Sequence, residues 1–254
     1  MKLEGIQAVV TGAASGLGRA TAAALIANGV RVGMVDLPGE RLDVAARELG
    51  GVPCPADVTN AADVEGMIQQ FVREVGPLHA AINCAGIGTA ARIVGRNGAM
   101  PLQDFMRTIT VNLGGTFNIL RTAAAAMMAN EPNPETGERG VIINTASIAA
   151  YDGQIGQAAY AASKAGVAGL TLPAARELAG SGIRVMCIAP GIFRTPMLAG
   201  LPEAAQQSLG QQVPFPARLG DPEEYAFLAT HILQNVMLNG EVIRLDGALR
   251  MAPR

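Results

Sequence analysis

A hydroxyl, a phenol and an ammonium occur together in one short stretch, SIAAYDGQIGQAAYAASK, which runs from Ser147 to Lys164. The alanine-rich run around Tyr160 predicts a helix, and residues four apart on a helix share a face, so Tyr160 and Lys164 can reach one group. The ordinary pKa of a phenol is about 10, and a cation held beside it stabilises the phenolate. With Ser147 brought in from an earlier segment, these side chains predict proton transfer at a carbonyl or alcohol oxygen.

A tyrosine and a lysine at this spacing also occur together by chance, so the pair alone does not establish catalysis. Lysine usage supports the catalytic interpretation, because Lys2 and Lys164 are the only lysines among 19 lysine and arginine residues. A compact ammonium fits between a phenol and a sugar hydroxyl where a planar guanidinium does not. Genome composition remains the alternative explanation for this bias.

A glycine-rich turn near the N-terminus predicts a phosphate-binding site. An apolar run at residues 6–11 leads into TGAASGLG and then into an alanine-rich helical pattern at residues 19–28. Gly12 permits a sharp turn, Gly16 lets the backbone approach a pyrophosphate, and Gly18 lets the helix pack closely on the strand. The G-x-x-x-G-x-G spacing departs from the G-x-G-x-x-G dinucleotide fingerprint, so an ordinary strand-to-helix turn is the alternative.

Asp36 ends the next expected strand, residues 31–36, and lies 18 residues after Gly18. Dinucleotide-binding folds place near this position the carboxylate that binds a ribose 2′-hydroxyl. The carboxylate would repel a 2′-phosphate, and the following Leu37 and Pro38 offer no cation. Asp36 therefore predicts NAD rather than NADP, unless it merely ends a strand.

Two further strand ends carry candidate site residues. Asp57 follows an expected strand at residues 52–56 and is placed to accept a hydrogen bond from an adenine amine, with a simple loop acid as the alternative. The strand at residues 79–83 runs into NCAG, whose small residues leave room for a ribose. Asn112 is the polar exception in the helix expected from Pro101 onward, where a solvent-facing side chain or a local kink is the alternative to a catalytic role.

Seven apolar, strand-like runs alternate with helical patterns along the chain. This order predicts an α/β fold of the doubly wound, Rossmann type, with a mostly parallel seven-stranded sheet and right-handed crossovers. No repeat or low-complexity linker divides the 254 residues, so we expect a single domain spanning residues 1–254. The seven runs lie at residues 6–11, 31–36, 52–56, 79–83, 141–145, 183–188 and 241–245.

Composition excludes several classes of function. A net charge of −2 and a pI of about 5.7 argue against a nucleic-acid partner. The sequence shows no leader and no apolar stretch approaching 18 residues, which predicts a cytoplasmic protein without a membrane partner. Three cysteines without CxxC spacing and two unclustered histidines predict neither a disulfide framework nor a metal site.

The chain is unusually apolar for a protein with these properties. Half of its residues are hydrophobic and only 16% are charged, against about 25% charged in a typical soluble domain. The Tyr160 helix carries small residues nearly all round, including Ala158, Ala159, Ala165, Gly166 and Gly169. The helix expected from Thr116 to Ala129 is similarly apolar. We therefore expect these two helices to be covered by the same two helices of a second subunit, through a two-fold contact.

Taken together, TGAASGLG, NCAG, Asn112, Ser147, YAASK and PGIFRTP resemble the short-chain dehydrogenase/reductase family over essentially the whole chain. Within that family, NEPNPETGERGVIINTAS, GQIGQAAYAASKAG, VPFPARLGDPEEYA and LNGEVIRLDGALRM are similar to members that act on 3-hydroxyacyl-CoA or hydroxysteroids. The resemblance also suggests a second two-fold contact through the C-terminal strand, and hence a homotetramer.

The resemblance implies roles for individual residues. Tyr160 would be the general acid/base, Ser147 would orient the substrate oxygen, and Lys164 would bond the nicotinamide ribose. Asn112 would hold a water in the proton relay, and Gln157 would join Ser147 and Tyr160 in contacting substrate. The NAD site would comprise Gly12, Ser15, Gly16, Leu17, Gly18, Asp36, Asp57, Val58, Asn83, Cys84, Ala85, Gly86, Tyr160, Lys164, Pro190, Gly191, Phe193 and Thr195.

The expected reaction is reversible oxidation of a secondary alcohol to a ketone with NAD as hydride acceptor. We expect 3-hydroxyacyl-CoA as the substrate, with a hydroxysteroid or a small alcohol as the alternative, and residues 195–217 as a lid over the substrate. A non-catalytic NAD-binding partner protein is a more distant alternative. The presence of Ser147, Tyr160 and Lys164 argues against it.

Overall fold

The structure is a computed structural model that describes residues 1–96, 98–199 and 203–253. A seven-stranded sheet in the order β3-β2-β1-β4-β7-β8-β9 forms its centre, and every neighbouring pair of strands is parallel. All seven predicted runs belong to this sheet, which confirms the predicted fold class with boundary shifts of one or two residues. The strands are β1 (Gln7–Thr11), β2 (Arg31–Asp36), β3 (Val52–Pro55), β4 (Ala80–Asn83), β7 (Gly140–Thr145), β8 (Ile183–Pro190) and β9 (Val242–Leu245).

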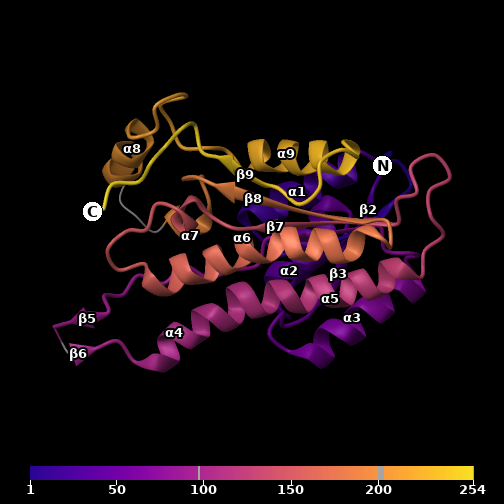
Figure 1. Ribbon diagram of the computed structural model, residues 1–254, viewed down its shortest axis with the longest axis horizontal. Helices are drawn as coiled ribbons and strands as arrows, with labels where there is room; N and C mark the ends of the chain where they lie inside the picture. The colour runs from indigo at the N-terminus through magenta and orange to yellow at the C-terminus, as the bar shows by residue number, and fades with distance from the viewer. Residues whose placement is uncertain (97, 200–202, 254) are drawn as a thin grey trace.

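Helices cover both faces of the sheet (Figure 1). Apolar side chains of α1, α2 and α9 share one core cluster with the sheet, and those of α3, α5 and α6 share the other. Strands buried on both faces read as continuous apolar runs rather than alternating ones, as β8 does with all eight residues buried. The helices are α1 (Gly16–Ala27), α2 (Glu40–Leu49), α3 (Ala61–Glu74), α5 (Gly115–Met128), α6 (Ala158–Ala179) and α9 (Pro222–Gln234).

The strand order reverses between β1 and β4. The chain leaves β1 toward β2 and β3 on one side and returns to β4 on the other. The ends of β1 and β4 are paired, and the connections that follow them lead to helices on opposite faces of the sheet. Ligands of open α/β sheets bind at such a switch point.

The helix expected from Pro101 onward has three parts that follow one another along a single rod (Figure 1). α4 (Leu102–Ile109) passes into a π-helical turn at Thr110–Gly114 and then into α5. Asn112 lies inside the π turn and is buried. The local kink considered from the sequence is therefore present, and π turns of this kind occur frequently at functional sites.

Two regions differ from the sequence-based expectation. The segment after NCAG contains a small antiparallel hairpin, β5 (Val94–Gly95) and β6 (Gly98–Ala99), which projects away from the sheet (Figure 1). The expected lid, residues 195–217, includes α7 (Pro196–Ala199) and α8 (Glu203–Gln211), while its residues 200–202 lie outside the described part of the chain.

From Ala158 to Gly169 the exposed face of α6 is as uncharged as expected, although fewer of the small residues form that face and Arg176 and Glu177 are exposed near the end of the helix. Ala162, Ala165 and Gly169 are exposed. Ala159 is buried, and a Cβ on Gly166 would lie 2.7 Å from the side chain of Leu113 in the same chain. The first five turns of this helix thus carry small residues on both sides because the inner ones let it pack closely on the π turn.

Candidate active site

A cavity of about 1150 Å³ opens at the switch point, where the carboxyl ends of β1, β2, β3, β4, β7 and β8 meet α4, the π turn and α6. Most of the predicted cofactor and catalytic residues line it. They are Gly12, Ser15, Gly16, Leu17, Gly18, Asp36, Asp57, Val58, Cys84, Ala85, Gly86, Ser147, Tyr160, Lys164, Pro190, Gly191, Phe193 and Thr195.

The glycine turn has the geometry that its sequence predicted. Gly12 and Gly16 have φ angles of +65° and +54°, which a residue with a side chain rarely adopts. A Cβ on Gly18 would collide with the carbonyl oxygen of Gly12, so only glycine lets α1 begin this close to β1. The turn thus brings the N-terminus of α1, where backbone N–H groups lack helical partners, to the cavity.

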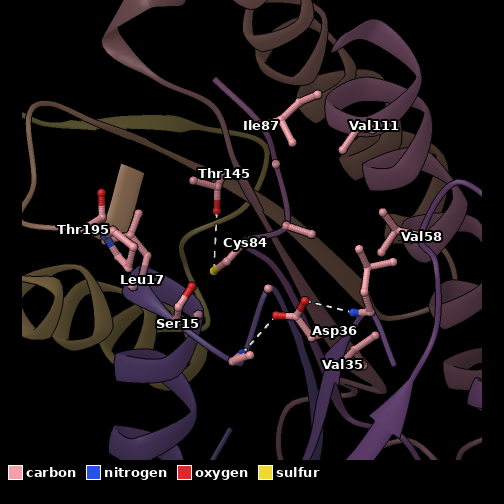
Figure 2. A pocket seen from close by; sticks show the side chains of 18 of the residues that line it. Ser15, Leu17, Val35, Asp36, Val58, Cys84, Ile87, Val111, Thr145 and Thr195 are labelled. Atoms are coloured by element: carbon pink, nitrogen blue, oxygen red, sulfur yellow. Dashed lines mark hydrogen bonds between the residues drawn. The ribbon is translucent and has the colours of Figure 1, made fainter. Parts of the chain in front are cut away.

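The carboxylate of Asp36 lies beside this turn (Figure 2). Its two oxygens accept hydrogen bonds from the backbone N–H groups of Ala14, at 3.0 Å, and Leu37, at 2.9 Å. Asp57, at the next strand end, accepts from the N–H and hydroxyl of Thr59 at 2.9 and 2.8 Å. Two anionic groups therefore line the same end of the cavity.

Lys164 and Tyr160 project from α6 into the cavity. The ammonium of Lys164 is buried, donates a 2.8 Å hydrogen bond to the backbone carbonyl of Thr145 at the end of β7, and lies 5.8 Å from the centre of the Tyr160 ring. At that distance the cation interacts with the ring. The predicted pair is thus brought together, and β7 fixes the position of its cation.

Ser147 reaches the same cavity from the segment that follows β7. Its Oγ accepts a 3.1 Å hydrogen bond from the N–H of Ala149, which fixes the direction of the side chain. A serine hydroxyl has one hydrogen to donate. With the oxygen held by Ala149, that hydrogen is placed to serve a group in the cavity.

The carboxamide of Asn112 braces the floor of the site rather than lining it. Its Nδ2 donates to the carbonyl of Ile87 and the hydroxyl of Ser163, both at 3.0 Å, and its Oδ1 accepts from the N–H of Ile87 at 2.8 Å. Ser163 in turn donates to the carbonyl of Tyr160 at 2.7 Å. The π turn is thereby tied both to the segment that follows β4 and to the helix that carries Tyr160.

Two other predicted residues lie away from the main cavity. Asn83 is buried and donates a 2.9 Å hydrogen bond to Asn144 of β7. Gln157 lines a separate cavity of about 420 Å³ together with Arg92 and Ile155. Their cofactor and substrate roles therefore stay predictions.

Sequence reasoning missed a buried polar group beneath the cavity. The Tyr225 hydroxyl of α9 lies 2.6 Å from Thr145 Oγ1 and 3.6 Å from Cys84 Sγ, and the Thr145 and Cys84 side chains face each other (Figure 2). Burial raises the pKa of both the Cys84 thiol and the Tyr225 phenol. Position at the end of a buried strand was the available signal for Thr145, whereas nothing local indicates Tyr225.

Two arginines at the cavity were also missed. Arg41 in α2 and Arg107 in α4 line the cavity along with the apolar side chains of Ile87 and Val111. Ile87 and Val111 face Val58 across the same end of the cavity (Figure 2). Apolar side chains of this kind suit a flat ring such as adenine.

These features fit a nicotinamide dinucleotide. The cavity is long enough to touch six strand ends, its glycine turn leaves room for a pyrophosphate, and Asp36 lies at the end of β2, the position from which dinucleotide-binding folds bind a ribose hydroxyl. Within residues 1–96, 98–199 and 203–253, no group of three or more histidine, cysteine or acidic side chains is arranged to hold a metal ion. In the same residues, each helix is too short or too polar to cross a membrane.

Comparison with known proteins gives concordant results. The model of the family described as short chain dehydrogenase matches residues 7–206. The chain is 54% identical to the 3-hydroxyacyl-CoA dehydrogenase type-2 of Drosophila melanogaster, with 96% of this chain and 97% of the fly protein covered. For the human protein of that name, the identity is 52%, with 99% and 97% covered.

A solved structure agrees with these matches. The crystal structure of 3-hydroxyacyl-CoA dehydrogenase type-2 from Mycobacterium avium superposes with a TM-score of 0.93 at 44% identity, covering 98% of each chain. The family model spans most of the chain, and the two animal relatives exceed half identity over nearly full length. The chain therefore belongs to the short chain dehydrogenase family and is an oxidoreductase that uses a nicotinamide cofactor.

Proposed function

We propose that this protein is an NAD-dependent dehydrogenase that interconverts 3-hydroxyacyl-CoA and 3-ketoacyl-CoA. The observation that carries the proposal is the convergence of Ser147, Tyr160 and Lys164 on one cavity, from two different elements. The substrate class rests on the relatives, whose name specifies 3-hydroxyacyl-CoA and whose identity to this chain is 54% and 52%.

In this mechanism each of the three side chains has a separate task. The nicotinamide ring, when bound, accepts or supplies the hydride. Ser147 donates a hydrogen bond to the substrate oxygen, and the Tyr160 phenol oxygen takes the hydroxyl proton during oxidation and returns it during reduction. The buried Lys164 ammonium would bond the nicotinamide ribose beside the Tyr160 ring, and its bond to the Thr145 carbonyl keeps it in place.

We further propose that NAD is preferred over NADP. The Asp36 carboxylate supports this proposal, because a 2′-phosphate at the same end of the cavity would lie near its negative charge. Arg41 lines the cavity as well, but its guanidinium comes from α2 rather than from the strand end. We therefore expect Arg41 to limit the preference rather than reverse it.

The lid proposal applies to residues 195–217. Thr195 and Pro196 line the cavity, and Val213 packs against Ile148, one residue after Ser147. The segment thus begins at the cofactor cavity and ends beside the catalytic serine, which is where an acyl chain must be shielded from water.

The substrate alternatives are a hydroxysteroid and a small alcohol. Steady-state rates with acetoacetyl-CoA, a steroid ketone and a simple β-ketoester, each with NADH, decide among them. We expect acetoacetyl-CoA to have the highest kcat/KM, and a steroid ketone that exceeds it would replace the proposed substrate. The more distant alternative, a non-catalytic partner protein, predicts negligible turnover with all three.

Replacing Tyr160 by phenylalanine tests the chemistry itself. The ring remains and only the proton carrier is lost, so we expect NADH binding to persist while less than about a tenth of the wild-type rate remains. A Tyr160→Phe variant that keeps more activity than this would exclude Tyr160 as the acid/base.

We propose a homotetramer as the assembly. The exposed side chains on the first turns of α6 are small and uncharged, and the exposed Phe117 and Met128 lie on α5, which covers the same face of the sheet. A second copy of this helix pair is the self-complementary cover for such a surface.

The cytoplasmic location stays a prediction from the sequence, which cell fractionation would check.

A further inference from the structure

A guanidinium at the end of β9 joins three parts of the chain around the catalytic segment. Arg244 forms a bidentate ion pair with Asp152, at 2.6 and 3.3 Å, and bonds Asp246 through Nε at 2.7 Å. It also donates to the carbonyl of Leu249 at 2.9 Å and lies 5.4 Å from the centre of the Tyr151 ring. The Arg244 and Asp152 side chains are 21% and 13% exposed, so the pair is largely shielded from water.

Asp152 lies between the two catalytic positions in the sequence. The segment from Ser147 to Gln157 leaves β7, forms one 3₁₀ turn at Ile148–Ala150, and enters α6 just before Tyr160. It contains no strand or α-helix that would hold it on the rest of the fold. Its placement therefore depends on side-chain and loop contacts.

Those contacts come mainly from the C-terminal residues. The side chain of Gln154 donates to the carbonyl of Ala252 at 2.9 Å, and the N–H of Ile155 donates to the carbonyl of Pro253 at 3.0 Å. Leu249 packs with Ile148 in a small apolar cluster. Arg244 is the charged centre of this contact, because it bonds both the catalytic segment and the C-terminal residues.

Asp246 connects the same group to the cofactor cavity. Gly191, which lines the cavity, accepts no side chain, because a Cβ there would lie 2.9 Å from the Cα and Cβ of Asp246. The N–H of Gly191 also donates to the carbonyl of Leu245 at 2.9 Å. These contacts do not involve the Arg244 side chain, so they hold the end of β9 against the cavity wall whether or not the guanidinium is present.

We propose that Arg244 is a positioning residue for the reaction, which acts through Asp152 to hold Ser147 and the start of α6 in register with the cofactor wall at Gly191. The inference rests on the proposed roles of Ser147 and Tyr160. Arg244 itself does not line the cavity, so it does not touch the reacting atoms.

The test uses the full chain and four variants. Arg244→Met and Asp152→Asn remove the ion pair, Asp152→Glu keeps a carboxylate, and Arg250→Met is the matched control because Arg250 also bonds Asp246, at 3.4 Å, but is 62% exposed. For each we would measure kcat and KM with the best of the three ketone substrates, the Kd of NADH by fluorescence, and Tm.

We expect Arg244→Met and Asp152→Asn each to lower kcat by about tenfold or more, because small displacements of a catalytic group have effects of this size. The NADH Kd should stay within about twofold and Asp152→Glu should recover most of the rate, because the geometry rather than the fold is affected. Arg250→Met should match the wild type.

Three outcomes would overturn the proposal. They are unchanged kcat in both pair-breaking variants, a loss of kcat that is matched by loss of NADH binding, and no recovery in Asp152→Glu. If Arg244→Met does not fold, Asp152→Asn and Asp152→Glu still decide the question. Failure of the proposed function is recognised separately, by an active Tyr160→Phe variant, whatever the result at Arg244.

Discussion

The carboxylate of Asp36 accepts a 3.0 Å hydrogen bond from the backbone N–H of Ala14, so the acid at the end of β2 also holds the glycine turn that follows β1. The sequence indicated a different task for Asp36, as the partner of a ribose hydroxyl, and gave no sign of its bond to the glycine turn. Because one side chain holds the glycine turn and is also proposed to bind the ribose, its removal should affect both the affinity for NADH and the selectivity between NADH and NADPH.

Replacing Asp36 by alanine should therefore have two measurable effects. We expect the wild type to prefer NADH over NADPH by at least about tenfold in kcat/KM, or about 1.4 kcal/mol. Asp36→Ala should narrow this ratio by removing the charge, and should also raise the Kd of NADH because the N–H of Ala14 loses its acceptor.

Asp36→Asn is the matched control for that experiment. It removes the charge but keeps an oxygen that can accept from Ala14, so the ratio should narrow with a smaller loss of NADH affinity than in Asp36→Ala. If the wild type had equal kcat/KM with NADH and NADPH, Asp36 would be ruled out as the residue that selects NAD.

The three cysteines provide a test of the cavity that does not depend on turnover. Burial raises the pKa of Cys54 to about 12 and that of Cys187 to about 11, and it also raises that of Cys84. The thiolate is the reactive form, so all three should react slowly with iodoacetamide at pH 8 in the folded protein. Cys84 should react before the other two, because it is less buried and lines the cavity.

Saturating NADH should slow the labelling of Cys84 by at least about tenfold, since bound ligand leaves few free sites. Peptide mapping by mass spectrometry identifies which cysteine has reacted. Labelling of Cys54 or Cys187 ahead of Cys84, or labelling of Cys84 at a rate that NADH does not change, would contradict the described position of the cavity.

Local patterns predicted the sheet, the glycine turn, Asp36, Asp57 and the NCAG motif, whereas lining residues such as Val58, Phe193 and Thr195 followed only from the family resemblance. A glycine turn, a strand-ending acid and a small-residue motif each follow a strand, and a parallel sheet brings all such ends to one edge. Tyr225 was not predictable in this way, since it reaches Thr145 from 80 positions further along the chain. The π turn at Asn112 is likewise determined by its contacts with Ile87 and Ser163 rather than by its neighbours in sequence.

Glu138 shows how a local pattern can mislead. It belongs to the polar segment NEPNPETGER, which predicts a surface loop, yet it is buried and accepts a 2.6 Å hydrogen bond from Arg184 of β8. Arg184 also donates to the carbonyls of Ile232, Leu233 and Leu238, which ties β8 to the end of α9.

Replacing Arg184 by methionine should therefore destabilise the protein strongly. Methionine removes the donor that Arg184 supplies to Glu138 Oε1 and to the Ile232 and Leu238 carbonyls. The N-terminal ammonium of Met1 remains 3.1 Å from Glu138 and still donates to the Leu233 carbonyl. Loss of one partner of a buried ion pair costs about 3 to 5 kcal/mol, and we expect the remaining ammonium to keep the cost at the lower end of that range. Urea unfolding at a fixed protein concentration measures the change in free energy of unfolding. Arg19→Met is the control, because it breaks an exposed ion pair with Glu48 and should lower the free energy of unfolding by less than about 1 kcal/mol. Equal losses for the two substitutions would refute the conclusion that the buried bonds of Arg184 stabilise the protein.

The assembly is tested at Ala165. This residue is exposed near the middle of the uncharged face of α6, whereas Ala168, three residues on, is only partly exposed and packs within its own chain. An arginine at Ala165 places a charge in the proposed two-fold contact without disturbing the core. Gln69→Arg on the exposed side of α3 is the control, because it adds the same charge elsewhere.

We expect the wild type and Gln69→Arg to sediment as tetramers at micromolar concentration, and Ala165→Arg to sediment as a smaller species. Because the helix that forms the contact also carries Tyr160 and Lys164, dissociation should lower kcat as well. Analytical ultracentrifugation paired with the ketone assay separates the two effects. A wild type that sediments as a fully active monomer would leave the uncharged face of α6 without its proposed partner and would disprove the tetramer.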